Sequence, residues 1–309
     1  MSKIDDRLNI KLPIWNAGMG MGMAGAALSS VVSNAGGLGV LGLGGMQPAA
    51  MRPVIAEMRV LTSRAFGVNI ILPMMQDGQI DTCFDEQIPL MVLFWGDPSP
   101  FVNDAHRRDV MVVSQCGDVE EAVRAAEAGV DGVIVQGTEA GGHVKATRPL
   151  QEVLSETVKE LGSVPVIAAG GIANGADIAA ALKLGASAVS MGTRFVATDE
   201  ALALDSYKSI ITNTESDQTV LTELFDQGWP NAAHRVIRNK AYDDWEAAGS
   251  PASGSRPDEE DDEGEEKEDE EEERDEEHEE DGLHEEEGEH EEDEKTKNKN
   301  KNKNKKNKN

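Results

Sequence analysis

Short runs of apolar, largely β-branched residues recur along the first 200 residues of the chain, and segments with helical spacing separate most of them. Runs of this kind are typical of parallel strands that are buried on both faces. We predict eight such strands, at 13–18, 38–42, 65–71, 89–94, 110–114, 132–136, 165–169 and 188–192. Eight strands that alternate with helices favour an α/β fold of the (β/α)8 TIM-barrel type over an open sheet.

Most connections between these strands carry helical signals. Helices are predicted at 24–34, 47–61, 118–128, 149–161 and 174–184. Asp118 is a suitable N-cap and Gly129 a suitable stop signal. The connection 74–87 has little helical pattern and is predicted to be a loop or a single turn. Segment 199–242 has a mixed helical pattern and is predicted to be ordered against the barrel.

The composition changes abruptly after Gly249, and we predict two regions, 1–249 and 250–309. Residues 251–309 contain 28 acidic and 11 basic residues, so they carry −17 of the total net charge of −29. An acidic tract is followed there by an alternating Lys-Asn tract. Such a segment cannot bury enough apolar surface to offset the entropy lost on ordering. We therefore predict a barrel domain for residues 1–249 and a disordered acidic tail for residues 250–309.

Charge and cysteine content exclude several classes of protein. Neither region is basic, which argues against nucleic-acid binding through phosphates. Cys83 and Cys116 have no disulfide or metal-site spacing, so we expect a reducing, cytoplasmic location. The sequence has no run of about 18 apolar residues, and no membrane span is expected.

Four glycine-rich turns fall at the C-terminal ends of predicted strands. They are Gly18-Met19-Gly20, the stretch Gly137 to His143, Gly170-Gly171 and Gly192-Thr193. In a barrel these strand ends meet on one face, where active sites lie, and the last two strands commonly provide a phosphate site. The four turns together predict a ligand site on that face.

His143 ends the most informative of these loops, because an apolar strand at 132–136 runs directly into it. A histidine in this setting is a candidate for proton transfer near neutral pH. Glu139 either orients the loop or forms an ion pair, and Lys145 and Arg148 are candidate partners for Glu139 or for a cofactor phosphate. Asn69, near the end of the third predicted strand, either hydrogen-bonds a flat ring or caps a loop.

The other histidines carry weaker signals. His106 is predicted to lie on a charged, solvated helix face, and His234 lies outside the barrel and belongs to no motif. The three histidines of the acidic tail are at most weak metal ligands, and no metal site is expected.

Several stretches of the chain resemble the nitronate monooxygenase family, formerly called 2-nitropropane dioxygenases. The matching stretches are 32–39, 66–69, 136–143, 168–173 and 191–195. The similarity covers roughly residues 12–242. Family members have an ordered C-terminal part that helps to cover the site, whereas here low-complexity sequence follows residue 242.

The resemblance implies that the domain 1–249 is an FMN-binding TIM barrel that oxidises alkyl nitronates with molecular oxygen. It implies that His143 is the base that takes a proton from the carbon of a nitroalkane, and that no metal is needed. The implied FMN contacts are Ala17, Gly18, Met19, Asn69, Gln136, Gly141, Gly170, Gly171, Ser190, Met191, Gly192 and Thr193.

Two alternatives stay open at this point. A related FMN- and NADH-dependent enoyl-thioester reductase shares the barrel and the motifs. The chain could also be a non-catalytic barrel whose acidic tail binds basic proteins such as histones.

Overall fold

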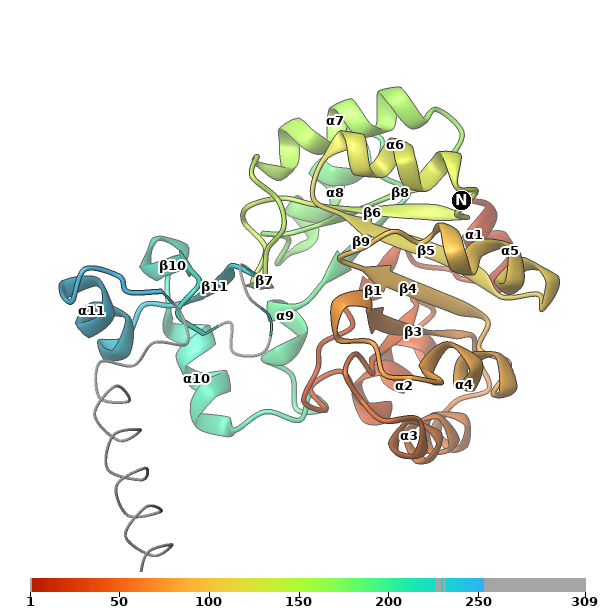
Figure 1. The fold of residues 1–309 in the computed structure, drawn as a ribbon, viewed down its shortest axis with the longest axis horizontal. Coiled ribbons are helices and arrows are strands. Elements are labelled where there is room, and N and C mark those ends of the chain that lie inside the picture. The colour runs from red at the N-terminus through yellow and green to blue at the C-terminus, as the bar shows by residue number, and fades with distance from the viewer. Residues whose placement is uncertain (1, 226–228, 230–231, 253–309) are drawn as a thin grey trace, which may run out of the picture. The chain divides into compact units, whose positions relative to one another are not determined.

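The computed structural model describes residues 2–225, 229 and 232–252 (Figure 1). The chain separates into two compact units, Met1–Ser253 and Gly254–Asn309. The second unit begins slightly beyond the boundary at 249/250 that the composition predicts. Residues 253–309 lie outside the described residues, so the predicted disorder of the tail stays a prediction.

Within the described part of the chain, eight parallel strands form one sheet in the order β1-β9-β8-β6-β5-β4-β3-β2. The strands are β1 (Ile14–Asn16), β2 (Gly39–Gly42), β3 (Phe66–Ile71), β4 (Leu90–Phe94), β5 (Met111–Cys116), β6 (Gly132–Gln136), β8 (Val166–Ala169) and β9 (Ala188–Met191). The end strands meet, because the Leu38 amide donates to the Ile14 carbonyl at 3.0 Å and the Asn16 amide donates to the Leu38 carbonyl at 3.3 Å. The sheet is thus a closed TIM barrel, and the predicted fold is confirmed.

A helix follows each barrel strand, and these helices surround the barrel (Figure 1). They are α2 (Ala26–Asn34), α3 (Pro48–Leu61), α4 (Gln79–Asp85), α5 (Ser99–Arg107), α6 (Val119–Glu127), α7 (Leu150–Leu161), α8 (Gly175–Lys183) and α9 (Thr193–Val196). The predicted cap of α6 is confirmed, since the Asp118 carboxylate accepts a hydrogen bond from the Glu121 amide at 2.7 Å. Such a cap satisfies a backbone donor that the helix itself leaves unpaired.

The core has two layers, because successive side chains of a strand point to opposite faces of the sheet. Val92 and Val113 pack with Trp15 inside the barrel, whereas Met91 and Val112 pack against the helices outside. Each fully buried side chain of this size contributes about 1.5–3 kcal/mol through removal from water. These layers hold the strand ends, and therefore the loops that follow them, in fixed positions.

The N-terminal helix α1 (Lys3–Leu8) was not predicted from its polar sequence. Ile4 of this helix is fully buried and joins the cluster inside the barrel. Gly132 begins β6 beside it, and a Cβ on Gly132 would lie 2.7 Å from the Ile4 Cδ1. The helix therefore packs at the N-terminal end of the barrel, opposite the glycine turns.

The prediction for the connection 74–87 was wrong. A 3-10 turn, η1 (Leu72–Met74), leads into this connection, and the connection itself contains the seven-residue helix α4. The apolar residues Ile80, Cys83 and Phe84 have helical spacing but span little more than one turn, so the sequence signal is weak. Tertiary contacts stabilise this segment: the buried Gln79 amide donates to the Leu43 carbonyl at 3.1 Å.

The helical prediction for 199–242 was only partly right. The segment contains the helix α10 (Asp205–Asn213), but also the turn η2 (Ser216–Gln218) and the strands β10 (Thr219–Thr222) and β11 (His234–Ile237), and α11 (Lys240–Ala247) follows. Strand β11 pairs in antiparallel fashion with β10 and with β7 (Gly142–His143), which lies in the loop after β6. An ordered C-terminal segment therefore joins the loop that carries His143.

The structure contains no helix, among the residues it describes, that is long and apolar enough to cross a membrane.

Candidate active site

The four predicted glycine turns follow β1, β6, β8 and β9, and all lie at the same end of the barrel because these strands are parallel. Neighbouring turns are in close contact. A Cβ on Gly192 would lie 3.7 Å from both the Ala17 Cβ and the Met19 Sδ, and a Cβ on Gly141 would lie 2.5 Å from the Thr193 Oγ1. The predicted site residues are therefore brought together around the mouth of the barrel.

The loop after β1 is fixed on both sides. The Ala17 amide donates to the Met191 carbonyl at 2.8 Å. Gly18 lies against Asn69, and a Cβ on Gly18 would overlap the Asn69 side chain. The Asn69 amide is buried and donates to the Val92 carbonyl at 3.3 Å. Asn69 thus links β3 to β4 while its side chain lines the first loop.

The turn after β8 depends on glycine. Gly170 has φ +117° and Gly171 has φ +66°, a region that other L-residues rarely adopt. A Cβ on Gly170 would lie 3.2 Å from the Gly137 carbonyl oxygen, so the turns after β6 and β8 are packed together.

The end of β9 combines buried and exposed groups. Ser190 and Met191 are buried, whereas Thr193 is exposed. The Gly192 carbonyl accepts the first hydrogen bond of the short helix α9 from the Phe195 amide at 2.8 Å. Backbone amides at such a strand-to-helix junction are the usual phosphate contacts of TIM barrels.

Gln136 determines the shape of the loop that carries His143. Its Nε2 donates to the His143 carbonyl at 2.9 Å, and its Oε1 accepts from the Lys145 amide at 3.0 Å. Glu139 fastens the same loop to the start of α7, because its carboxylate accepts from the Leu150 amide at 2.9 Å. Of the two roles that the sequence left open for Glu139, the structure therefore supports orientation of the loop.

His143 lies in a cluster of aromatic rings at the mouth of the barrel. Its ring centroid is 3.5 Å from that of His234, 4.0 Å from that of Trp229 and 6.2 Å from that of Trp95. Trp95 follows β4 and has φ +65°, an uncommon conformation for a bulky residue. Strain of this kind often accompanies functional sites, where the surrounding structure holds a side chain in place.

Sequence reasoning missed three members of this cluster, namely Trp95, Trp229 and His234. The interpretation of His234 as a residue outside the barrel and without a motif overlooked its position opposite His143 in the β7–β11 pairing. The signal that was available is weak, because only Val236 and Ile237 in the segment 234–237 are β-branched residues of the kind that favours strands. Its partner is about 90 residues away, and local pattern does not reveal such pairing.

The charged residues near the loop pair with carboxylates other than Glu139. Arg148 binds Glu156 at 2.7 Å, and Lys145 forms an ion pair with Glu121. Neither binds Glu139. The Lys145 ammonium also lies 5.8 Å from the centre of the Trp95 ring, a distance that permits a cation–π contact.

Cys116 lies at the end of β5, and burial raises the pKa of its thiol to about 12. Burial has the same effect on the Cys83 thiol, whose pKa is also raised to about 12. Both groups are therefore protonated at neutral pH, and neither is a nucleophile at this site.

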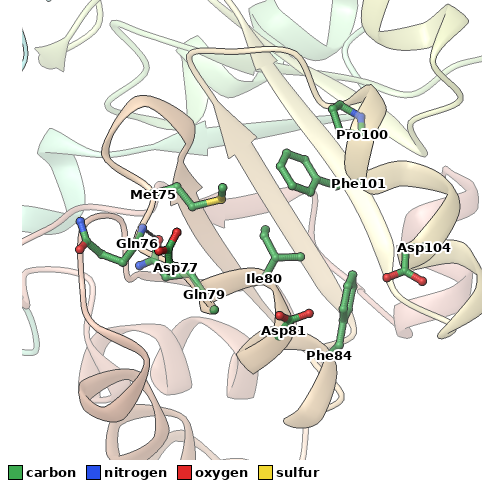
Figure 2. Close-up of a pocket in the computed structure, with 11 residues that line it drawn as sticks. Met75, Gln76, Asp77, Gln79, Ile80, Asp81, Phe84, Pro100, Phe101 and Asp104 are labelled. Atoms are coloured by element: carbon green, nitrogen blue, oxygen red, sulfur yellow. Dashed lines mark hydrogen bonds between the residues drawn. The ribbon is translucent and has the colours of Figure 1, made fainter.

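A separate hollow of about 270 Å³ lies between α4 and α5 on the outside of the barrel (Figure 2). Phe84 and Phe101 line it, together with acidic residues such as Asp81. None of the predicted site residues contributes to it. Among the residues that the structure describes, no group of three or more His, Cys, Asp or Glu side chains is arranged to hold a metal ion.

The residues at the barrel mouth fit a flavin. Glycines in all four turns let the backbone approach a flat ring and its phosphate closely. The buried amides of Gln136 and Asn69 lie beside this mouth and hold its backbone in place by hydrogen bonds, and Gly141, Gly171 and Thr193 are exposed there.

Comparison with known proteins identifies relatives with the same fold. The family model described as nitronate monooxygenase matches residues 2–90 and 75–276. A probable nitronate monooxygenase of Staphylococcus aureus (strain Newman) is 30% identical over 269 residues, which cover 72% of this chain and 76% of that protein.

Two groups of solved structures are similar. A nitroalkane oxidase from Streptomyces ansochromogenes has a TM-score of 0.74 and 30% identity, and the match covers 83% of this chain and 84% of that one. FabK from Thermotoga maritima has a TM-score of 0.72 and 34% identity, and the match covers 78% of this chain and 75% of that one. Together with the family model, which spans most of the barrel, these matches show that the chain belongs to the nitronate monooxygenase family and is a flavin-dependent oxidoreductase.

Proposed function

We propose that this enzyme oxidises alkyl nitronates with molecular oxygen, that FMN is its flavin, and that His143 is the general base when the substrate is a neutral nitroalkane. The observation that carries the proposal is the position of His143 at the mouth of the barrel, on a loop whose Gly141 contacts Thr193 at the end of β9. A proton acceptor and a candidate phosphate site thus belong to one continuous surface. The similarity to a nitroalkane oxidase supports the same substrate class.

The proposed FMN site uses all four turns. Ala17, Gly18 and Met19 would line one side, with Asn69, Gln136 and Gly141 beside the ring. The phosphate end would lie at Gly170, Gly171, Ser190, Met191, Gly192 and Thr193. Their mutual contacts, described above, support one shared site, because the first, sixth and last loops touch one another.

The chemistry divides between cofactor and protein. A nitronate is a stabilised carbanion, and a flavin held by these turns would supply the redox chemistry that connects its oxidation to the reduction of oxygen. The protein places the substrate, and the neutral imidazole of His143 accepts the proton when a nitroalkane must first be converted into its nitronate. The buried Gln136 amide holds the backbone of His143, so the ring stays at the mouth.

The first experiment is to purify the full chain, record its visible spectrum and extract the cofactor. We expect a flavin spectrum, release of FMN and consumption of oxygen when a nitronate is added. A colourless protein that yields no FMN would reject the proposal.

The same preparation tests the alternatives. Oxidation of NADH in the presence of an enoyl thioester, without turnover of nitronate, would identify the reductase instead. The barrel also occurs in the enoyl reductase domain of MlnA, but at 15% identity that likeness shows the fold alone. Bound flavin without either turnover would favour the non-catalytic interpretation.

A further inference from the structure

His143 and His234 form a cross-strand pair, and the proposed function assigns a role only to His143. They lie directly opposite one another where β7 pairs with β11. Their ring centroids are 3.5 Å apart and the ring planes are inclined at 46°. Opposed side chains in an antiparallel pair share one face of the sheet and influence each other strongly.

Other rings limit the movement of this pair. The Trp229 ring lies 4.0 Å from the His143 ring at an interplanar angle of 33°, and the Trp95 ring meets His143 edge-on. Both histidines are half-buried. The orientation of the His143 imidazole is therefore set by packing as well as by the Gln136 hydrogen bond to its carbonyl.

The close contact also couples the charges of the two histidines. Two imidazolium ions at this distance repel each other, so protonation of one opposes protonation of the other. Groups that interact this closely titrate as a pair, in two steps that belong to both. A neighbouring charge commonly moves such a step by about one pH unit or more.

The charged groups described nearby have contacts of their own. Lys145 is paired with Glu121, and the Arg235 guanidinium donates to the Thr138 carbonyl at 3.0 Å. Glu139 accepts from the Leu150 amide. In β10, the residue opposite His234 is the uncharged Thr222. The contact between the imidazoles of His234 and His143 follows directly from the pairing of β7 with β11.

We propose that His234 is a positioning residue that acts through His143. It holds the His143 ring in place at the barrel mouth, and its own protonation opposes that of His143, which extends to lower pH the range in which His143 is neutral and can accept a proton. The second part rests on the proposed role of His143 as the base.

The direct test is an NMR titration of the full chain labelled with ¹³C at histidine Cε1, with signals assigned by substitution. In the wild type we expect His143 and His234 to titrate together in two steps. In His234→Phe, which retains a ring but removes the charge, His143 should titrate in one step, at a pH above the midpoint of its two wild-type steps. His234→Gln should produce the same shift in the His143 titration. This second variant replaces His234→Phe in the experiment if the phenylalanine variant does not fold.

His106→Gln is the matched control. His106 is paired with Asp131 at 3.0 Å, near the C-terminal end of α5 and therefore at the opposite end of the barrel. This variant should leave the His143 titration unchanged. An identical His143 midpoint in the wild type and in the folded His234 variants would overturn the proposal.

Activity provides the second measurement. The acidic limb of nitroalkane turnover should move to higher pH in His234→Phe by the same amount as the NMR midpoint, whereas turnover of preformed nitronate should not follow it. If the two histidines titrate together but the protein oxidises no nitronate, the proposed coupling of His143 with His234 stands and the proposed function is rejected. If the enzyme oxidises nitronates but His143 and His234 titrate independently, the proposed coupling is rejected and the proposed function stands.

Discussion

Gln136 fixes the loop that carries His143 by hydrogen bonds to its backbone. It is the last residue of β6, and both ends of its buried amide bind the backbone of the loop that follows. Satisfied hydrogen bonds of this kind rigidify a loop, because breaking them would leave buried polar groups unpaired. Because Gln136 belongs to β6, its hydrogen bond to the His143 carbonyl fixes the position of His143 relative to the barrel.

His143→Gln tests the proposed base at the residue scale. Glutamine retains polarity and approximate size but cannot accept the proton. We expect turnover of neutral nitroalkane to fall by about 10²–10⁴-fold, the usual contribution of a general base. Oxidation of preformed nitronate should change much less, because no proton has to be removed. Steady-state rates on both substrate forms measure this difference, and equal losses on the two would refute the base role.

Gly18→Ala tests the contact between the first loop and β3. The added Cβ would overlap Asn69, whose side chain is buried and cannot move away, so we expect a loss of about 1–3 kcal/mol in stability and a lower flavin content. Gly20→Ala is the matched control in the same loop, because nothing lies within 4 Å of the position of its Cβ. Thermal denaturation and flavin per chain are the measurements. Similar results for the two variants would contradict the packing described here.

At the scale of elements, ion pairs join the connection between β3 and β4 to the helix α3. Arg59 and Arg52 of α3 bind Glu86 at the end of α4, at 2.6 and 2.8 Å. Hydrogen bonding by the Arg59 guanidinium lowers the pKa of the Glu86 carboxyl below its ordinary value of 4.5. A carboxyl with a lowered folded pKa stabilises the protein above its unfolded pKa, and this contribution is lost as the pH falls through the folded pKa.

Glu86→Gln should therefore lower the stability at pH 7 by about 1 kcal/mol, or roughly 2–4 °C in Tm. The difference from the wild type should begin to shrink as the pH falls below about 4.5, and it should be lost below the lowered pKa of the folded Glu86 carboxyl, where the wild-type group is also neutral. Glu57→Gln removes the same charge from the exposed face of α3 and should have little effect. Thermal denaturation of the wild type and of both variants from pH 3 to 7 measures this effect. A Tm difference between the wild type and Glu86→Gln that does not depend on pH would contradict the proposed role of the Glu86 charge.

Local sequence patterns predicted the barrel strands because each is a short, largely apolar run, and β1, β6, β8 and β9 lead directly into the glycine turns. The same logic placed Gly18, Gly141, Gly170 and Gly192 on one face, where the structure has them. Helix α4 was missed because seven residues give too little periodicity, and β11 because its partner β7 is only two residues long and distant in sequence. His234 could not be assigned a place without that pairing.

At the scale of the whole molecule, the described core lies within the first unit. The buried apolar clusters involve residues from Ile4 to Ala232, and the acidic tract begins beyond them. The last described residues are tied to α11, because the Trp245 Nε1 donates to the Pro251 carbonyl at 2.9 Å. The first unit therefore contains the contacts that a barrel needs for stability.

Deletion of residues 254–309 should leave Tm within a few degrees of that of the full chain and should retain flavin content and turnover. The predicted partners of the tail are basic proteins, so salt-sensitive binding to a basic polypeptide such as polylysine should be lost. Melting curves, flavin content and a pull-down at low and high salt measure these effects. A truncated chain that loses its flavin would show that the tail contributes to the barrel.

The most direct test of the central claim is anaerobic reduction of the bound flavin. A nitronate is added to the purified full chain in the absence of oxygen, and the visible absorbance of the flavin is followed. We predict that the absorbance bleaches with nitronate alone and returns when oxygen is admitted. A flavin that stays oxidised with nitronate but bleaches with NADH would contradict the proposed function.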